Sequence, residues 1–195
     1  SAVGQTRASS SELRVMNDLA FRTLEKFPEP EFSELSREAF SDYEPSQLLT
    51  DVMAKEEMAA FATPLTDEAD ALRIGCFRGN ALLAWTYARR AQGRQLHMIN
   101  SGVALAERRN GIYSQLVKMI IEHARVQGYT AIASRHAVHN NPVIIAKLKL
   151  GFFVSGFEYS EVHGPLVRLT YLVSELRRTL HRARSRPIRG FRGSL

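Results

Sequence analysis

The sequence contains very little cysteine and no long apolar run. Its single cysteine, Cys76, excludes an internal disulfide and indicates a reducing compartment. A zinc site would need several ligands at suitable spacing, and the sequence offers no such group, so we expect no metal. No apolar run is long enough to span a bilayer, and Ser1–Arg14 lacks the apolar core of a secretory signal. We therefore expect a soluble, cytoplasmic protein without a membrane partner.

The excess of positive charge is confined to one end of the chain. Residues 174–195 contain seven arginines and one acidic residue, and so they carry the whole formal charge of +6. Such a segment can attract nucleic acid or an anionic membrane, or it can be a solvated extension or a packed terminal helix. Phe191 is its only Phe, Tyr or Trp, which leaves little for base stacking and argues against a nucleic-acid partner.

The rest of the chain has the size and pattern of one mixed α/β domain. Its 195 residues and 45% hydrophobic content suit a single hydrophobic core. We expect a mobile arm over residues 1–16, a folded domain over 17–173, and a basic tail or helix over 174–195. Periodicity predicts strands over 21–24, 72–76, 83–87, 96–105, 130–134, 152–159 and 166–173, and helices over 31–40, 48–58, 112–124 and 143–150.

One turn between a strand and a helix has the features of an anion site. In the segment Val103–Leu116, an apolar strand leads into a short turn that opens directly into the helix at Ile112. The first amides of a helix have no internal partners and bind phosphate, and Gly111 lets the backbone approach a ligand closely. Arg108 and Arg109 add positive charge. The residues alone therefore predict an anion site, with phosphate as the expected group.

Two motifs resemble the GCN5-related N-acetyltransferase (GNAT) family. Its signature in this turn is Arg or Gln, two residues, Gly, one residue, then Gly or Ala; Arg108 and Gly111 match, whereas Tyr113 stands at the small position. A later family segment runs from an Asn through a helix with a Tyr to Gly-Phe. Asn140 and Gly151-Phe152 fit this spacing, and Lys147 stands at the tyrosine position. The resemblance covers about residues 21–173.

The resemblance implies a fold and a cofactor. The expected fold is α/β (α+β), with a mixed, mostly antiparallel central sheet of about seven strands, flanked by helices, whose parallel central strands splay apart. The expected co-substrate is acetyl-CoA, and the acceptor is a small-molecule or protein amine. The residues implied to bind the cofactor are Val103, Leu105, Arg108, Arg109, Asn110, Gly111, Ile112, Tyr113, Ser114 and Asn140.

The resemblance also implies catalytic groups. The family tyrosine usually acts as the acid for the departing thiolate, so Lys147 or Tyr113 would take that role here, although Lys147 can equally be a surface residue on a short helix. Four side chains are possible bases: His97, Glu107, His136 and His139. The segment 42–44, Asp-Tyr-Glu, follows the first helix and can either meet the acceptor or form a helix cap.

Alternatives to the enzyme remain open. The departures at Tyr113 and Lys147 also suit a catalytically silent module that binds acyl-CoA. The basic segment 174–195 would suit a nucleic-acid-associated protein, which predicts binding with a steep salt dependence. A homodimer is possible, because members of the family often dimerise.

Overall fold

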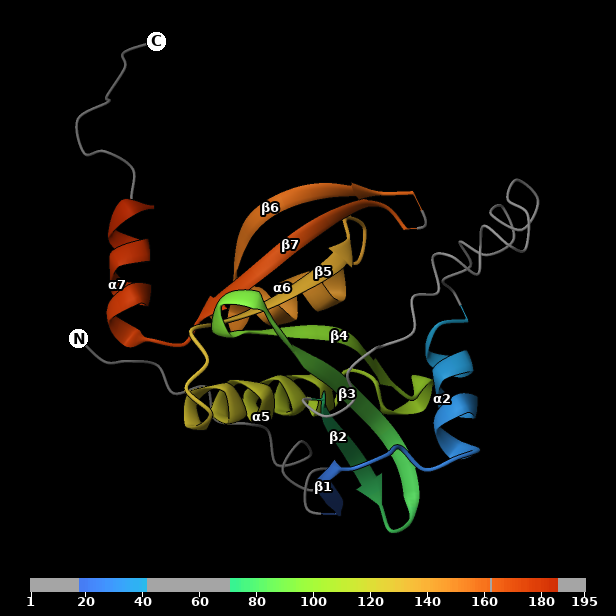
Figure 1. The fold of residues 1–195 in the computed structure, drawn as a ribbon. Helices are drawn as coiled ribbons and strands as arrows, with labels where there is room; N and C mark the ends of the chain where they lie inside the picture. The colour runs from blue at the N-terminus through green and yellow to red at the C-terminus, as the bar shows by residue number, and fades with distance from the viewer. Residues whose placement is uncertain (1–17, 42–70, 162, 186–195) are drawn as a thin grey trace, which may run out of the picture.

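The computed structural model describes residues 18–41, 71–161 and 163–185 (Figure 1). The strands are β1 (Leu19–Leu24), β2 (Ala71–Arg78), β3 (Ala81–Ala91), β4 (Gln95–Val103), β5 (Ala131–Ala137), β6 (Phe153–Ser160) and β7 (Gly164–Leu172). The α-helices are α2 (Glu31–Ala39), α5 (Ile112–Val126), α6 (Asn141–Lys149) and α7 (Glu175–Arg184), and short 3-10 turns cover Gln92–Arg94 and Leu105–Glu107.

The seven strands form one sheet in the order β1-β2-β3-β4-β5-β7-β6. Among the strands of the described residues, the only parallel neighbours are β4 and β5, which helix α5 connects; all the other neighbouring strands are antiparallel. A parallel pair needs a crossover of this kind, whereas short turns suffice for the hairpins. The predicted mixed, mostly antiparallel sheet with parallel central strands is thereby confirmed.

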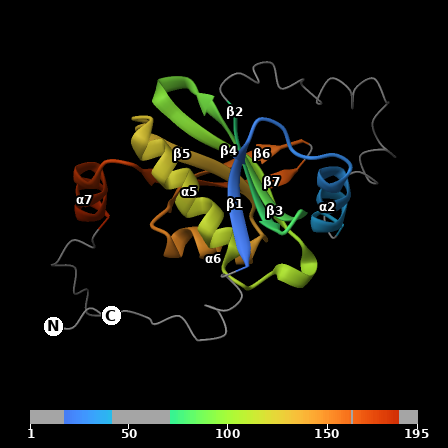
Figure 2. The ribbon, with the colours of Figure 1, turned by 90° about the horizontal axis from the view of Figure 1, so that it is seen from below.

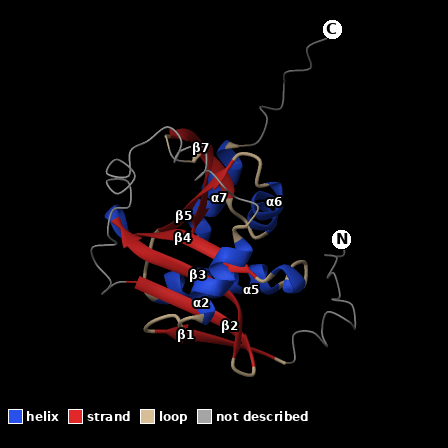
Figure 3. Ribbon diagram, turned by 90° about the vertical axis from the view of Figure 1, so that its right-hand side faces the viewer, coloured by secondary structure: helices blue, strands red, loops and turns tan. Residues whose placement is uncertain are grey.

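Helices cover both faces of the sheet (Figures 2 and 3). On one face, apolar residues of α5 at helical spacing, such as Leu116 and Ile120, belong to the main core together with Leu96, Met98 and Ile132 of the central strands. This periodicity is the reason why α5 forms where the sequence predicts it. Cys76 is fully buried in the same core.

On the other face, α2 packs on a smaller aromatic cluster around Trp85. The indole is fully buried, contacts Phe32 and Phe40 edge to face, and donates a hydrogen bond from Nε1 to Asn100 Oδ1 at 3.0 Å. Gly102 lies opposite Trp85 on β4, and a Cβ atom there would be 2.1 Å from the indole. The close packing of β3 and β4 therefore depends on this glycine.

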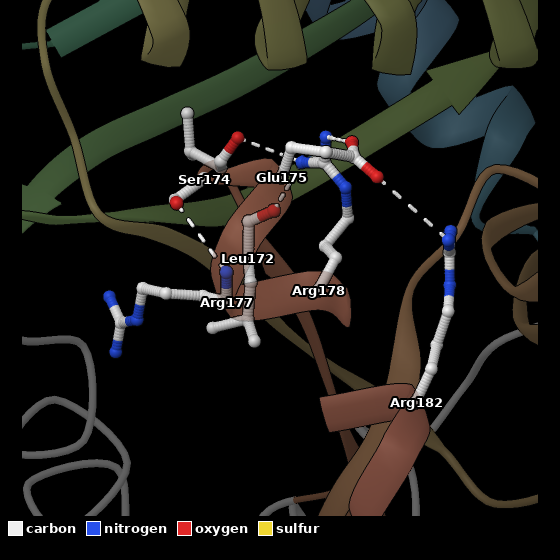
Figure 4. Close-up of polar contacts among 7 residues, drawn as sticks. Leu172, Ser174, Glu175, Arg177, Arg178 and Arg182 are labelled. Carbon is white, nitrogen blue, oxygen red and sulfur yellow. Dashed lines mark hydrogen bonds and ion pairs between the residues drawn. The ribbon is translucent and has the colours of Figure 1, made fainter. Parts of the chain in front are cut away.

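The basic segment after the sheet contains a docked helix. Arg178 of α7 donates hydrogen bonds to the carbonyl oxygens of Leu172 (2.6 Å) and Val173 (2.8 Å) and pairs with Glu175 (Figure 4). Its guanidinium also lies over the ring of Tyr171. Ser174 caps the helix by accepting a hydrogen bond from the Arg177 amide. Of the two structures expected for this segment, a helix is the one formed over residues 175–184.

Some of the predictions concern residues that the structure does not describe. The helix expected over 48–58 and the acceptor-facing segment at 42–44 both lie outside the described ranges, as do the arm over 1–16 and residues 186–195. Among the described residues, no helix is long and apolar enough to cross a membrane.

Candidate active site

The site begins where the two parallel strands separate. The register of β4 and β5 covers four pairs, of which the last is Met98↔Ser134. Beyond this pair β4 continues to Val103 and β5 to Ala137, without further pairing between them. The main-chain groups of both strands past this point are thus left without partners from the neighbouring parallel strand.

A β-bulge explains why β4 leaves β5 here. On its other side β4 pairs with β3, where Asn100 faces Tyr87 and Met98 faces Ala88, so Ile99 is an extra residue. A bulge bends its strand and increases the local twist. The bulge falls directly after the last pair with β5, which places the separation of the two central strands at residues 98–99.

The turn after β4 is shaped to expose backbone amides. Arg109 (φ 69°) and Gly111 (φ 77°) both adopt left-handed backbone conformations, and Gly111 is the residue before the first turn of α5. The first intrahelical hydrogen bond is donated by Gln115 to Gly111 O, so the amides of residues 112–114 precede it. A Cβ at Gly111 would have no atom within 4 Å, which shows open space beside these amides. Such a helix start suits a phosphate group.

Two of the predicted cofactor residues have protein partners in this structure. Arg108 donates a hydrogen bond to Ala39 O at 2.9 Å and a longer one to Val103 O at 3.4 Å. The Leu105 amide donates to Glu38 Oε1 at 2.8 Å. These bonds connect the end of α2 to the turn after β4.

The other predicted cofactor residues divide into buried and accessible groups. Ile112 is buried, and Tyr113 packs its ring against the main core, where burial raises the pKa of its hydroxyl. Ser114 is half-buried. Asn140 precedes α6, and its side-chain amide makes no hydrogen bond within the described part of the chain. The Tyr113 ring is thus accommodated by the core.

Lys147 is buried at the point where the strands separate. Its side chain has no exposed surface, and Nζ donates hydrogen bonds to Ser134 Oγ (2.6 Å) and Met98 Sδ (3.2 Å), the last paired residues of β5 and β4. It also lies over the ring of Phe152. Burial without a carboxylate partner lowers the pKa of Lys147 to about 7. Of the two interpretations of this residue, the surface one is therefore wrong.

Ser134 extends this contact into a chain of three polar groups. Its hydroxyl lies 3.0 Å from Nε2 of His136, two residues along the same strand. Burial, followed by the charge of Lys147 and by His97, lowers the pKa of His136 to about 3. The imidazole is therefore neutral near pH 7, and Lys147 can donate to Ser134 while Ser134 donates to His136.

The remaining possible bases lie in different surroundings. The Glu107 carboxylate forms an ion pair with Arg78 at 2.5 Å, and this hydrogen bond holds the Glu107 pKa below its ordinary value. His139 is exposed. His97 is half-buried on β4, and burial, with several nearby arginines, lowers its pKa to about 4. The structure thus brings together Lys147 and His136, but not Glu107.

Sequence reasoning missed Ser134 and Met98 as partners of the lysine. Ser134 is a polar residue within a strand otherwise composed of alanine and isoleucine up to that point, and this was the available signal. Met98 gave none, because a methionine in an apolar strand is most simply a core residue. No group of three or more acidic, histidine or cysteine residues that could hold a metal occurs in the described ranges.

Comparison with known proteins identifies the family of the chain. A sequence model of the acetyltransferase (GNAT) family matches residues 18–152. The chain belongs to this family. Among curated proteins, in contrast, no sequence matches it.

Solved structures of acetyltransferases share the fold at low sequence identity. The ribosomal-protein-S18-alanine N-acetyltransferase of Escherichia coli is 13% identical, covers 80% of this chain and 94% of its own, and has a TM-score of 0.61. A probable acetyltransferase from Staphylococcus epidermidis is 18% identical over 80% and 99%, with a TM-score of 0.62. A Bacillus subtilis acetyltransferase solved in complex with CoA is 16% identical over 79% and 98%, with a TM-score of 0.56.

The residues present fit the co-substrate that GNAT enzymes use, which is acetyl-CoA. The open amides of residues 112–114 suit its pyrophosphate, and the edge of β4 beyond Met98 that no longer pairs with β5 suits the amides of its pantetheine arm. Asn140 offers a side-chain amide without an internal partner among the described residues. The buried amine of Lys147 marks the end of this path.

Proposed function

We propose that this protein is an acetyl-CoA-dependent N-acetyltransferase in which Lys147 serves as the proton donor. The observation that carries the proposal is the position of its amine, buried at the last pair of β4 and β5 and bonded to both strands. Membership of the GNAT family and the exposed amides before Gln115 support it. The acceptor is an amine on a small molecule or a protein.

The mechanism follows from the buried hydrogen-bonded chain. Bound acetyl-CoA would supply the acetyl group and leave as a thiol. Lys147 holds a proton at Nζ in an apolar environment, where a pKa near 7 is well suited to proton transfer at neutral pH. Ser134 accepts the hydrogen bond from Nζ and can donate in turn to Nε2 of neutral, half-buried His136, and this chain holds the lysine amine in place.

Replacement of the lysine by methionine tests this role. In Lys147→Met the chain keeps an unbranched side chain but loses the proton donor. General acid catalysis contributes about 10²–10⁴-fold, so we expect kcat to fall by at least about 100-fold. Release of CoA, followed with a thiol reagent over a panel of amines, measures kcat, and calorimetry with acetyl-CoA measures binding.

The matched control is Lys149→Met, on the same helix but exposed, which should leave kcat unchanged. Full turnover by Lys147→Met would show that the lysine is not the donor. If the wild-type protein bound acetyl-CoA but released no CoA with any amine, the catalytically silent binding module would be the correct function.

A further inference from the structure

A polar hollow lies on the sheet face opposite α5. Its volume is about 260 Å³, and it is lined by Ala91, Gln92, Gln95, His97, Ala133, Ser134, Arg135 and Arg168. Leu96 and Met98 of β4 belong to the core beneath α5, so by strand alternation Gln95 and His97 face the other side. The hollow and the core beneath α5 are thus separated by the central strands themselves.

The hollow contains an excess of positive charge. Arg135 on β5 and Arg168 on β7 lie directly opposite each other in the sheet. Arg135 forms an ion pair with Glu158 at 2.9 Å, whereas the Arg168 guanidinium has no carboxylate partner within the described residues. Like charges placed directly opposite destabilise a sheet. An anionic ligand that bridged them would remove this cost.

The lowered pKa of His97, on the neighbouring strand β4, reflects the same excess of positive charge. Its pKa is lowered to about 4 by burial first, and then by Arg135, Arg89, Arg168 and Lys147 in decreasing order. These groups come from four different elements, β5, β3, β7 and α6. No carboxylate contributes to this pKa with the opposite sign.

The hollow adjoins the proposed site of transfer across the sheet. Ser134 is among its lining residues and also accepts the hydrogen bond from the buried Lys147 amine, at the last pair of the two parallel strands. A ligand in the hollow therefore lies on the opposite face of the sheet from Lys147, close to where β4 and β5 separate. The co-substrate site described above begins at the turn before α5, away from the residues that line the hollow.

We propose that this hollow, with Arg135 and Arg168 as its charged walls, binds an anionic group of the amine acceptor, either a carboxylate or a phosphate. The proposal rests on the proposed acetyltransferase function and names the class of its acceptor. A guanidinium pair suits both groups, because each arginine presents a planar fork of donors to two oxygen atoms. The amine of such an acceptor would point toward the separation of the strands.

Matched pairs of amines test the class. The full chain is assayed for CoA release with β-alanine against β-alaninamide, and with phosphoethanolamine against ethanolamine. We expect kcat/KM to be about 10- to 100-fold higher for one anionic member than for its neutral partner, as for a charge-assisted hydrogen bond. The pair that shows the larger ratio identifies carboxylate or phosphate.

Two arginine variants locate the effect. Arg168 is exposed, so Arg168→Gln is expected to fold and to lose the preference for the anionic amine over its neutral partner. Arg184→Gln, on α7 and equally exposed, should keep the preference. Loss of the preference in both variants to the same degree would overturn the proposal.

His97 provides a readout that does not depend on turnover. An anion between the arginines should raise the His97 pKa above about 4, which NMR of its ring proton measures with the preferred amine present and absent. Arg168→Gln should weaken the rise. Turnover without anionic preference and without a His97 shift would overturn the anion site and leave the acetyltransferase intact. A His97 shift without any turnover would overturn the acetyltransferase and support the anion site.

Discussion

At the scale of single residues, Lys147 is the most unusual feature of the chain. A lysine is seldom fully buried without a carboxylate partner, and this one has only a hydroxyl, a thioether and an aromatic ring around its amine. The fold accepts this arrangement because the amine can become neutral. The stability of the protein should therefore depend on pH through this group.

We expect the free energy of unfolding to rise with pH above about 7. The pKa of Lys147 is about 7 in the folded protein and ordinary, near 10.5, when unfolded, so between these values the unfolded chain binds more protons. The slope is at most about 1.4 kcal/mol per pH unit. Urea unfolding of the wild type and Lys147→Met at pH 7, 8 and 9 measures it. The difference between the two proteins should change with pH, and parallel curves would contradict the buried-amine account.

The burial of Lys147 could not be predicted from the sequence, although its position in the motif could. Helix α6 has apolar residues on nearly all its sides, so no apolar stripe in the sequence indicates which side faces the sheet. In the structure Ile145 and Leu148 are exposed and the lysine is inside. Spacing to Gly151 identified the position, but the choice of face was set by the sheet rather than by the helix.

At the scale of elements, periodicity was sufficient where one face is buried and the other solvated. Helix α5 and the β2–β3 hairpin form where the pattern predicts them. The bulge at Ile99 could not be predicted, because a single inserted residue in an apolar strand changes no composition and follows no turn signal. The strand predicted over 96–105 also ends earlier, at Val103, because residues 105–107 form a 3-10 turn.

The contact of β4 with β3 makes a prediction at this scale. In Gly102→Ala the added Cβ would lie 2.1 Å from the Trp85 ring, which is fixed by its hydrogen bond and by Phe32 and Phe40. Overpacking of this kind costs about 1–3 kcal/mol, which thermal unfolding would show as a lower Tm.

The control for that variant is Gly156→Ala in β6, where a Cβ would meet no atom within 4 Å. This change should be neutral or stabilise by about 0.4–1 kcal/mol through the unfolded chain. An equal loss of stability in both variants would mean that the cost comes from the strand backbone rather than from the indole.

At the scale of the whole molecule, the described part of the basic segment is anchored to the sheet by one arginine. Arg178 is only 18% exposed, and two carbonyl oxygens at the end of β7 accept its hydrogen bonds (Figure 4). His181 adds a stacked contact with Phe153. Charge counting alone could not distinguish this anchored helix from a solvated tail, since both have the same composition.

Loss of this anchor should destabilise the protein. Arg178→Ala leaves two carbonyl groups without their charged donor, a loss of about 1.5–3 kcal/mol. For a chain of this length the Tm should fall by roughly 3–10 °C in a thermal scan. Arg177→Ala removes the same charge from the neighbouring, exposed position, where only the backbone amide is bonded, and its Tm should stay close to that of the wild type. Equal Tm values for the two variants would show that the anchor contributes nothing.

The extra residue at Ile99 also reverses the alternation of side chains along β4. Before it, even-numbered residues such as Leu96 and Met98 face α5; after it, odd-numbered ones such as Val103 do. One continuous strand therefore turns its even-numbered side chains toward α5 before the extra residue and its odd-numbered ones after it. In a sequence that lacked Ile99, the side chains of residues 100–103 would exchange the two faces of the sheet.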